Sequence, residues 1–295
     1  YEAALARAAD GVSAPDARAW ISQFPVKEMS DHGWVKRPED RHELIKSYLA
    51  FFDVNGPKEW ESRYKNSISG VSFRTSPTFH SKLGAVTAWL RKGEQEASRV
   101  KVGTWNKEEL VSRLPALRAL SKLKSPISFI PKIQGICAEA GLAVVVLKAP
   151  TGCRASGATR FVNPSKPIVI LSFRYLSDDQ FWFTFFHELG HVILHGETIT
   201  FVDDDDVDSQ NPDSRKEDEA NRFASDTLIP PDKMEKLRTL PLQKFDVIRF
   251  AVSLDIAPGI VVGQLQHQKL IGPQQMNYLK RRYTWDEINR ATANL

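Results

Sequence analysis

His187, Glu188 and His191 form an H-E-x-x-H sequence, a spacing of residue types that can carry out metal-dependent hydrolysis. Residues four apart on a helix lie one turn apart on the same face, so both imidazoles can bind one zinc ion. Glu188 lies close to that face and can take a proton from a water that zinc acidifies. It can then pass the proton to the leaving amine of a cleaved peptide bond. We therefore predict that His187 and His191 are zinc ligands and that Glu188 is the catalytic base.

A third protein ligand is needed, because a catalytic zinc ion keeps only its fourth position for water. His195 continues the four-residue spacing of the two histidines. It would lie about 12 Å along the helix axis from His187, however, at 1.5 Å per residue. One ion cannot comfortably hold both, so we expect His195 to be a structural histidine near the end of the helix.

The better source of the third ligand is the next predicted helix, at residues 217–226. Glu217, Asp218 and Glu219 all lie at its start, and a carboxylate from a second helix is the gluzincin arrangement of ligands. Chemistry alone leaves Glu217 and Glu219 as alternatives. Asn221 follows Glu217 by four residues and could support that ligand by a hydrogen bond.

The helix that carries the motif is predicted at residues 177–195. Ser177 and Gln180 fit a capping box at its start. Aromatic residues occur nearly all round it, which is typical of a helix buried in the centre of a domain. Buried polar groups need partners, so the two histidines and the glutamate require an explanation such as a metal ion.

Three short β-like runs precede this helix, at residues 142–148, 157–162 and 167–172. Turn residues separate them, so we predict a small antiparallel sheet. The run at residues 157–162 could present an exposed edge, to which an extended substrate could add as a further strand.

The fold class predicted from these patterns is α+β. Residues 1–125 show helical spacing and are predicted to be a helical regulatory or partner-binding region. Residues 126–231 contain the strands and the motif, and form the predicted metallopeptidase domain. Residues 232–295 again read as helical and are expected to pack on that domain. The acidic run at residues 203–206 lacks the spacing of a calcium loop, so we interpret it as a solvated loop.

The N-terminal part of the chain is basic, which raises the question of nucleic-acid binding. Residues 1–124 hold 21 Lys+Arg against 15 Asp+Glu, a net charge of +6 in a chain whose total is +4. These charges are scattered, which favours a solvated helical surface over a binding stripe. Five tryptophans lie among them at helical spacing and are expected to be core residues: Trp20, Trp34, Trp60, Trp89 and Trp105.

The cellular compartment is predicted from what the sequence contains. Cys137 and Cys153 form no C-x-x-C pair, and we interpret both as reduced thiols. Neither a signal peptide nor an apolar run of about 20 residues is visible, so we expect a cytoplasmic protein without membrane contact. The chain opens on Tyr1 within a helical pattern, and we expect that a segment preceding it has been removed.

The motif region resembles the ImmA/IrrE family of metallopeptidases. The residues that carry the resemblance are HELGHVILH at 187–195 and EDEANRFASDTLIP at 217–230, together with SGATR at 156–160 and PIVILS at 167–172. The resemblance runs from about residue 132 to residue 230 and implies a zincin-like domain. It implies that Glu217, four residues before Asn221, is the third ligand beside His187 and His191, and that Glu188 is the catalytic base.

Further runs are FPVKEM at 24–29, AWLRKGE at 88–94, FWFTFFH at 181–187 and APGIVVGQLQ at 257–266. Through them the whole chain also resembles longer, HigA-like antitoxin or regulator proteins that join an N-terminal helix-turn-helix to such a domain. The helix-turn-helix is not in this sequence, so DNA binding is expected only through that missing domain. The resemblance implies a protein substrate, such as a transcriptional repressor or other regulator in a stress, phage or toxin–antitoxin context. It also implies a toxin or regulatory partner for the N-terminal region.

Two functions of different classes follow. The first is a zinc-dependent endopeptidase, and the second is an antitoxin or regulatory binding protein whose metal site is sensory or vestigial. The intact set of His187, Glu188, His191 and Glu217 favours the endopeptidase, because a vestigial site could lose Glu188 first. Arg160 and Tyr175 could supply a donor to a developing oxyanion, although either residue could equally be structural.

Overall fold

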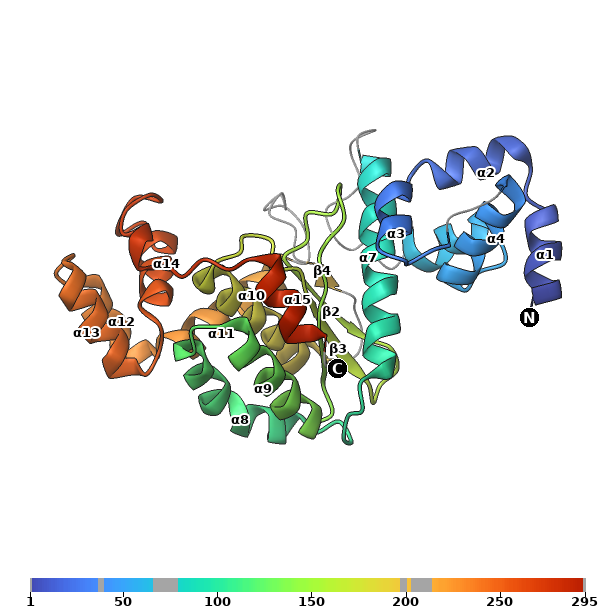
Figure 1. The fold of residues 1–295 in the computed structure, drawn as a ribbon. Coiled ribbons are helices and arrows are strands. Elements are labelled where there is room, and N and C mark those ends of the chain that lie inside the picture. Colours follow the sequence, from blue (N-terminus) through green and yellow to red (C-terminus); the bar gives the residue numbers. More distant parts are fainter. Residues whose placement is uncertain (1, 37–39, 66–78, 197–200, 203–213, 294–295) are drawn as a thin grey trace.

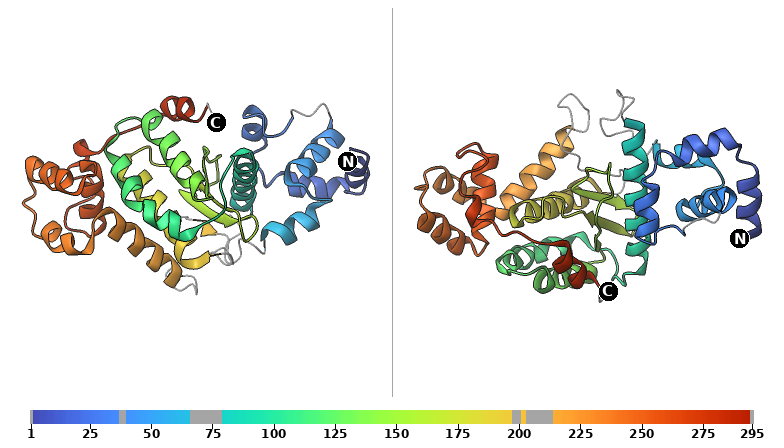
Figure 2. Two further views of the ribbon diagram at one scale, coloured as in Figure 1. Left: turned by 90° about the horizontal axis from the view of Figure 1, so that it is seen from below. Right: turned by 45° about the horizontal axis from the view of Figure 1, so that its top comes forward.

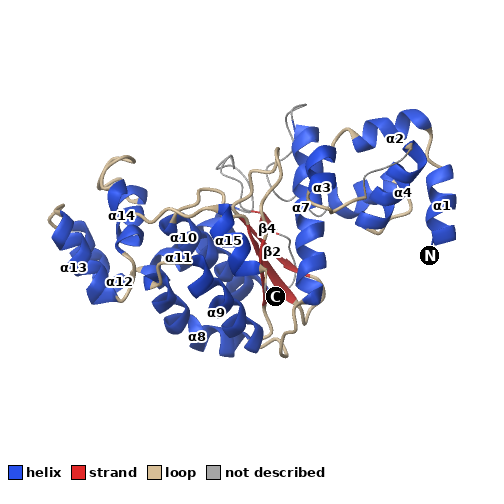
Figure 3. Ribbon diagram, viewed as in Figure 1, coloured by secondary structure: helices blue, strands red, loops and turns tan. Residues whose placement is uncertain are grey.

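The computed structural model describes residues 2–36, 40–65, 79–196, 201–202 and 214–293, and it has the predicted α+β class (Figures 1 and 3). The N-terminal elements are α1 (Glu2–Asp10), α2 (Ala14–Ile21), α3 (Val26–Asp31), α4 (Arg41–Phe52), α5 (Pro57–Trp60), η1 (Glu61–Lys65), α7 (Phe79–Arg99), α8 (Lys107–Ala119) and η2 (Leu120–Lys122). The central elements are α9 (Pro126–Glu139), β1 (Ala143–Val146), β2 (Gly157–Phe161), β3 (Pro167–Leu171), α10 (Asp178–Gly190), η3 (His191–His195), β4 (Phe201–Val202) and α11 (Ser214–Leu228). The C-terminal elements are α12 (Pro231–Arg238), α13 (Lys244–Leu254), α14 (Pro258–His267), η5 (Asn277–Leu279) and α15 (Trp285–Thr292).

The sheet has the strand order β1-β3-β2-β4, and it is mixed. Strands β2 and β3 pair antiparallel, as predicted, across a short turn. Strands β1 and β3 pair in parallel, so the prediction of a wholly antiparallel sheet is wrong in this pairing. The reason is the long connection from Val146 to Pro167, which includes β2 and returns the chain to the same end of the sheet.

Each face of the sheet is covered by helices, and side chains alternate between the two faces. Val144 and Val169 belong to the core formed with α9 and α10, whereas Val145 and Ile168 belong to the core formed with α7 and the N-terminal helices. Figure 2 shows α7 lying against the sheet, with the N-terminal helices beyond it and α12–α14 at the opposite end of the molecule. A Cβ on Gly93 would collide with Ile170, so this glycine allows α7 to pack closely on β3.

The core formed with α9 and α10 crosses both of the predicted domain boundaries, and the core formed with α7 crosses the boundary at residue 125. Leu110 and Leu117 of α8 pack with α9 and α10, and residues of α13, α14 and α15 join the same core. The boundaries at residues 125 and 231 remain predictions. Trp20, Trp60 and Trp89 are almost fully buried, which confirms their interpretation as core residues. Trp34 and Trp105 are partly buried against the two cores.

Three further observations bear on the sequence-based expectations. Cys137 and Cys153 are both buried. No helix in the described part of the chain has the length and apolar character required to traverse a membrane. The acidic run at residues 203–206 lies outside the described residues.

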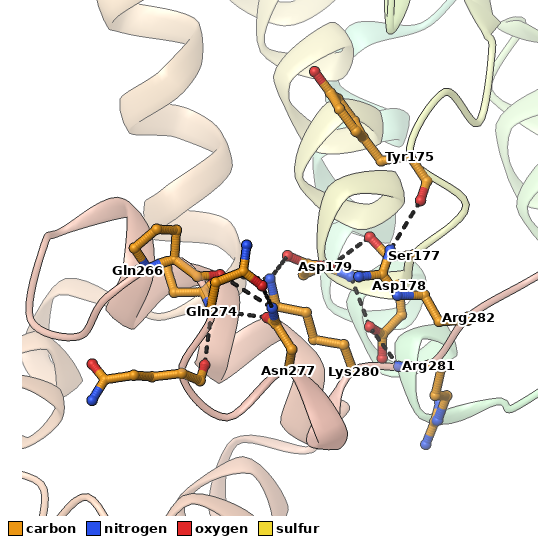
Figure 4. A network of polar contacts seen from close by, with 12 residues as sticks. Tyr175, Ser177, Asp178, Asp179, Gln266, Gln274, Asn277, Lys280, Arg281 and Arg282 are labelled. Carbon is orange, nitrogen blue, oxygen red and sulfur yellow. Dashed lines mark hydrogen bonds and ion pairs between the residues drawn. The ribbon is translucent and has the colours of Figure 1, made fainter.

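The start of α10 is held by the C-terminal segment rather than by the predicted capping box. The Ser177 hydroxyl donates to Asp179 Oδ1 over 2.7 Å, and no side-chain cap hydrogen bond from Ser177 is formed. The backbone N–H of Arg281 donates to Asp178 Oδ1 over 3.1 Å, and Lys280 Nζ lies 2.6 Å from Asp179 Oδ2 (Figure 4). The predicted capping box is therefore wrong: the Ser177 hydroxyl donates to the Asp179 side chain, and it accepts no hydrogen bond from the backbone at the helix start.

Candidate metal centre

His187 lies near the end of α10 and His191 is the first residue of η3. Both side chains point toward α11. Helices α10 and α11 pack closely at Gly190, where a Cβ would lie 3.1 Å from Ala220 Cα. His191 begins the wide π-helical turn η3, which continues α10 to His195. His187 and His191 are 2% and 1% exposed, so these polar rings lie within the core and need partners there.

His187, His191 and Glu217 form a cluster whose ligand atoms all lie within 4.8 Å of one another. The two Nε2 atoms are 3.0 Å apart, and they lie 3.3 and 3.4 Å from the Glu217 carboxylate oxygens. Ligands bound tetrahedrally at about 2.1 Å from a zinc ion are about 3.4 Å apart. The three side chains therefore have the donor types and separations of a three-residue metal site.

The protonation states of the cluster also suit a metal. Burial alone would raise the pKa of the Glu217 carboxyl, but hydrogen bonds from His187 and His191 lower it to about 2. Burial lowers the pKa of His191 to about 4, although the hydrogen bond to Glu217 acts in the opposite direction. At neutral pH Glu217 is therefore ionised and His191 is neutral, and these are the states in which both residues bind metals.

Glu188 is completely buried between α10 and strand β2. The Thr159 hydroxyl donates to Glu188 Oε2 over 2.6 Å and lies 3.1 Å from the backbone oxygen of Glu188. A Cβ on Gly157 would collide with the Glu188 carboxylate. Strand β2 thus positions the Glu188 carboxylate in two ways: the Thr159 hydroxyl binds it, and Gly157 leaves room for it. Neither Gly157 nor Thr159 was predicted as a site residue, although alternation along β2 places both on one face.

Glu219, the alternative third ligand, lies outside the cluster. Glu219 Oε2 is 3.1 Å from His195 Nε2, and Arg215 Nε donates to Glu219 Oε1 over 3.0 Å. His195 in turn has its Nδ1 atom 3.0 Å from Nδ1 of His191. Glu217 and Glu219 are two residues apart on α11, so they point to different sides of that helix.

Asn221 has a different partner from the one predicted. Its Oδ1 lies 3.0 Å from His187 Nδ1, so it supports a histidine of the cluster and not Glu217. Because Asn221 lies one turn after Glu217 on α11, the same helix face brings both to His187.

The predicted oxyanion donors lie in different places. Arg160 points to the opposite face of the sheet from Thr159 and forms an ion pair with Glu94 of α7. This excludes Arg160 from the cluster, because neighbouring strand residues face opposite sides. Tyr175 is 41% exposed in the loop before α10, and the Arg174 guanidinium lies over its ring at 5.3 Å.

The prediction of an exposed edge at residues 157–162 is wrong for its first half. Strand β4 pairs with β2 at Ala158 and Thr159, so β4 is the outer strand there. The reason is that the chain after η3 returns to the sheet and covers this edge. Val162, beyond the pairing, is 52% exposed.

Comparison with known proteins identifies the segment that contains this cluster. Residues 140–256 match the family model of the M78 peptidases, described as an IrrE N-terminal-like domain. The matched segment includes the whole sheet, α10 and α11, and therefore all four predicted site residues. Comparisons with curated proteins and with solved structures found no match. The match supports a peptidase with a metallopeptidase-like centre.

Proposed function

Starting from the finding that residues 140–256 form an ImmA/IrrE-family metallopeptidase-like domain, we propose that this chain is a zinc-dependent endopeptidase that cleaves a protein substrate. One observation carries the proposal. His187, His191 and Glu217 converge to within 4.8 Å, and Glu188, the residue next to His187, is buried and held by a hydroxyl. Two buried histidines and two acidic groups at such a distance would be costly without a chemical role.

The proposed roles of the residues follow from their donor types. His187, His191 and Glu217 hold the ion, which supplies Lewis acidity for the hydrolysis of a peptide bond. Glu188 accepts the proton of the attacking water and later delivers it to the leaving amine. The Thr159 hydroxyl fixes the direction of the carboxylate, so that one oxygen is anchored and the other can exchange the proton. Zinc fits the set because it accepts nitrogen and oxygen ligands in tetrahedral geometry.

The proposed substrate class is a regulatory protein, such as a transcriptional repressor, and this part rests on the family resemblance. The N-terminal helices α1 to α5 would contact the substrate or a regulatory partner such as a toxin. They are joined to the catalytic part through α7, which packs directly on the sheet. A partner that binds these helices could therefore change the packing around Glu188 through the sheet.

The test combines metal analysis with a cleavage assay. The purified protein is supplied with Zn²⁺, its zinc content is measured, and cleavage of a quenched fluorescent library of random peptides is followed. We expect about one zinc ion per chain and zinc-dependent cleavage. The Glu188→Gln variant should keep the zinc and lose cleavage, because the amide cannot act as a base.

The matched control is Glu139→Gln, which makes the same change at an exposed glutamate at the end of α9, outside the predicted ligand set. It should retain cleavage. Zinc binding without cleavage of the library or of folded protein candidates would support a regulatory binding protein with a sensory metal site. Absence of zinc binding, or full cleavage by Glu188→Gln, would contradict the proposed function.

A further inference from the structure

A chain of buried and half-buried polar groups extends from the proposed metal site to the protein surface. His191 Nδ1 lies 3.0 Å from His195 Nδ1, and His195 Nε2 lies 3.1 Å from Glu219 Oε2. Arg215 closes the chain at the surface by donating to Glu219 Oε1 over 3.0 Å. The His195 side chain is 5% exposed and that of Glu219 is 43% exposed. None of these contacts involves the Nε2 atom of His191, which faces Glu217.

A metal ion held by His187, His191 and Glu217 would take the lone pair of His191 Nε2, because a ring nitrogen that carries a proton cannot be a ligand. The proton of the neutral His191 ring would then lie on Nδ1, which is 3.0 Å from His195 Nδ1. His195 Nδ1 would accept this hydrogen bond. His195 Nε2–H would in turn donate to Glu219 Oε2 over 3.1 Å, because a carboxylate accepts hydrogen bonds.

We infer that Glu219 and His195 are positioning residues that hold His191 in the Nδ1–H form, with the Nε2 lone pair directed at the metal position. The inference rests on the proposed function, because it assigns a purpose to the direction of that lone pair. It also gives a role to two residues for which sequence analysis predicted only a structural histidine and an alternative ligand. Partners of this kind fix the ring orientation of a ligating histidine and its basicity.

The two histidines of the site are supported in different ways. His187 Nδ1 faces Asn221 Oδ1 at 3.0 Å. An amide can turn to present either an oxygen or an NH₂ group, so Asn221 permits both forms of His187. A carboxylate can only accept a hydrogen bond, so Glu219 requires a proton on Nε2 of His195. The contacts on the His191 side of the site therefore end on a fixed acceptor, whereas those on the His187 side do not.

The local backbone explains how His195 reaches His191. Residues His191–His195 form the π-helical turn η3, and Gly196 follows with φ of +62°, a conformation that favours glycine. Wide turns of this type occur mostly as single turns and are frequent at functional sites. Here the turn brings the His195 ring between His191 and Glu219, which lies in the second turn of α11.

The test measures zinc affinity by competition with a chromophoric chelator, which requires no substrate. His195→Ala should weaken zinc binding by about 10–100-fold, the range found for the loss of such a partner. His195→Asn should keep most of the affinity, because the amide oxygen lies near the position of Nδ1 and can accept from His191. Glu219→Ala should cause a smaller loss, since water can replace the half-exposed carboxylate, and Glu219→Gln should remain close to wild type. If His195→Ala binds zinc within twofold of wild type, the inference is wrong.

A second measurement separates this inference from the proposed function. Nitrogen-15 NMR of the zinc-loaded protein at pH 8, where imidazoles are ordinarily neutral, identifies which ring nitrogen carries each proton. We expect Nε2–H on His195 and Nδ1–H on His191. Nδ1–H on His195 in the wild type would overturn the inference even if zinc binds. If zinc fails to bind the wild type, the proposed function is contradicted, while the same measurement on the metal-free protein still shows whether His195 carries its proton on Nε2, beside Glu219.

Discussion

The Thr159 hydroxyl and the Glu188 carboxylate form a buried 2.6 Å hydrogen bond that joins strand β2 to the helix of the proposed site. Thr159→Val keeps the shape of the side chain and removes the donor. A buried carboxylate that loses its partner costs about 1–3 kcal/mol, so we expect a loss of this size in the free energy of unfolding. Urea unfolding measures it. Thr159→Ser, which retains the hydroxyl, should stay close to wild type, and equal losses in both variants would contradict the role of the hydrogen bond.

Gly157 should be intolerant of any side chain. A Cβ at this position would collide with the Glu188 carboxylate, so Gly157→Ala must displace Glu188 or bend β2. We expect a large loss of kcat in the peptide assay, because small misplacements of a catalytic group reduce its effectiveness strongly. The control is Gly135→Ala on the exposed face of α9, where a Cβ meets nothing within 4 Å. Retained activity in Gly157→Ala would show that Glu188 has room to move.

Metal binding should stabilise the folded protein through Glu217. A ligand present at 100 times its Kd adds about 2.7 kcal/mol to the free energy of unfolding. We expect Zn²⁺ to raise the melting temperature of the wild type and a chelator to reverse the rise. Glu217→Ala should lose this response, and Glu219→Ala should keep most of it. The opposite order would move the third ligand to Glu219.

The ion pair between Lys280 and Asp179 should contribute strongly to stability. Its atoms are 2.6 Å apart, and its side chains are only 8% and 3% exposed (Figure 4). Lys280→Met leaves a buried carboxylate without its cation, which costs about 3–5 kcal/mol. The comparison is Lys122→Met, which breaks an equally short pair with Asp255 whose side chains are 49% and 57% exposed. That change should cost under about 1 kcal/mol in urea unfolding.

Asp178 should make stability depend on pH in a direction opposite to that of most carboxyl groups. Burial, together with the charge of Asp179, raises the pKa of Asp178 from 3.8 to about 6. The stability contributed by a group with a raised pKa is present below its unfolded value and is lost as the pH rises through its folded value. The unfolding free energy of the wild type, relative to Asp178→Asn, should therefore fall between pH 4 and pH 6, by about 3 kcal/mol at most. A constant difference across this window would contradict the raised pKa.

The local chemistry of the site was predictable because it depends on short-range geometry. The helical period alone places His187 and His191 one turn apart, and Glu188 follows His187 directly. The apolar residues around the motif indicated a buried helix, and Trp182, Phe185 and Phe186 are indeed fully buried. The α+β class followed from the change of hydrophobic spacing along the chain, from helical to strand-like and back.

The tertiary structure decided which residues meet this helix. Glu217 and Glu219 are chemically equivalent and two positions apart, and only the packing of α11 against α10 at Gly190 and Ala220 directs Glu217 to the histidines. The same packing gives Asn221 to His187 and leaves Glu219 to His195.

Long-range pairing likewise decided the order and the directions of the strands in the sheet. Turn residues indicate where strands end but not which strands become neighbours, so the parallel pairing of β1 with β3 could not be read from them. The position of β2 between β3 and β4 then sends Thr159 to Glu188 and Arg160 to Glu94. By itself the sequence therefore determined the motif, its helix and the fold class, because helix and strand periods are local. The partners of each side chain came only from the tertiary structure, because they depend on how separate elements pack.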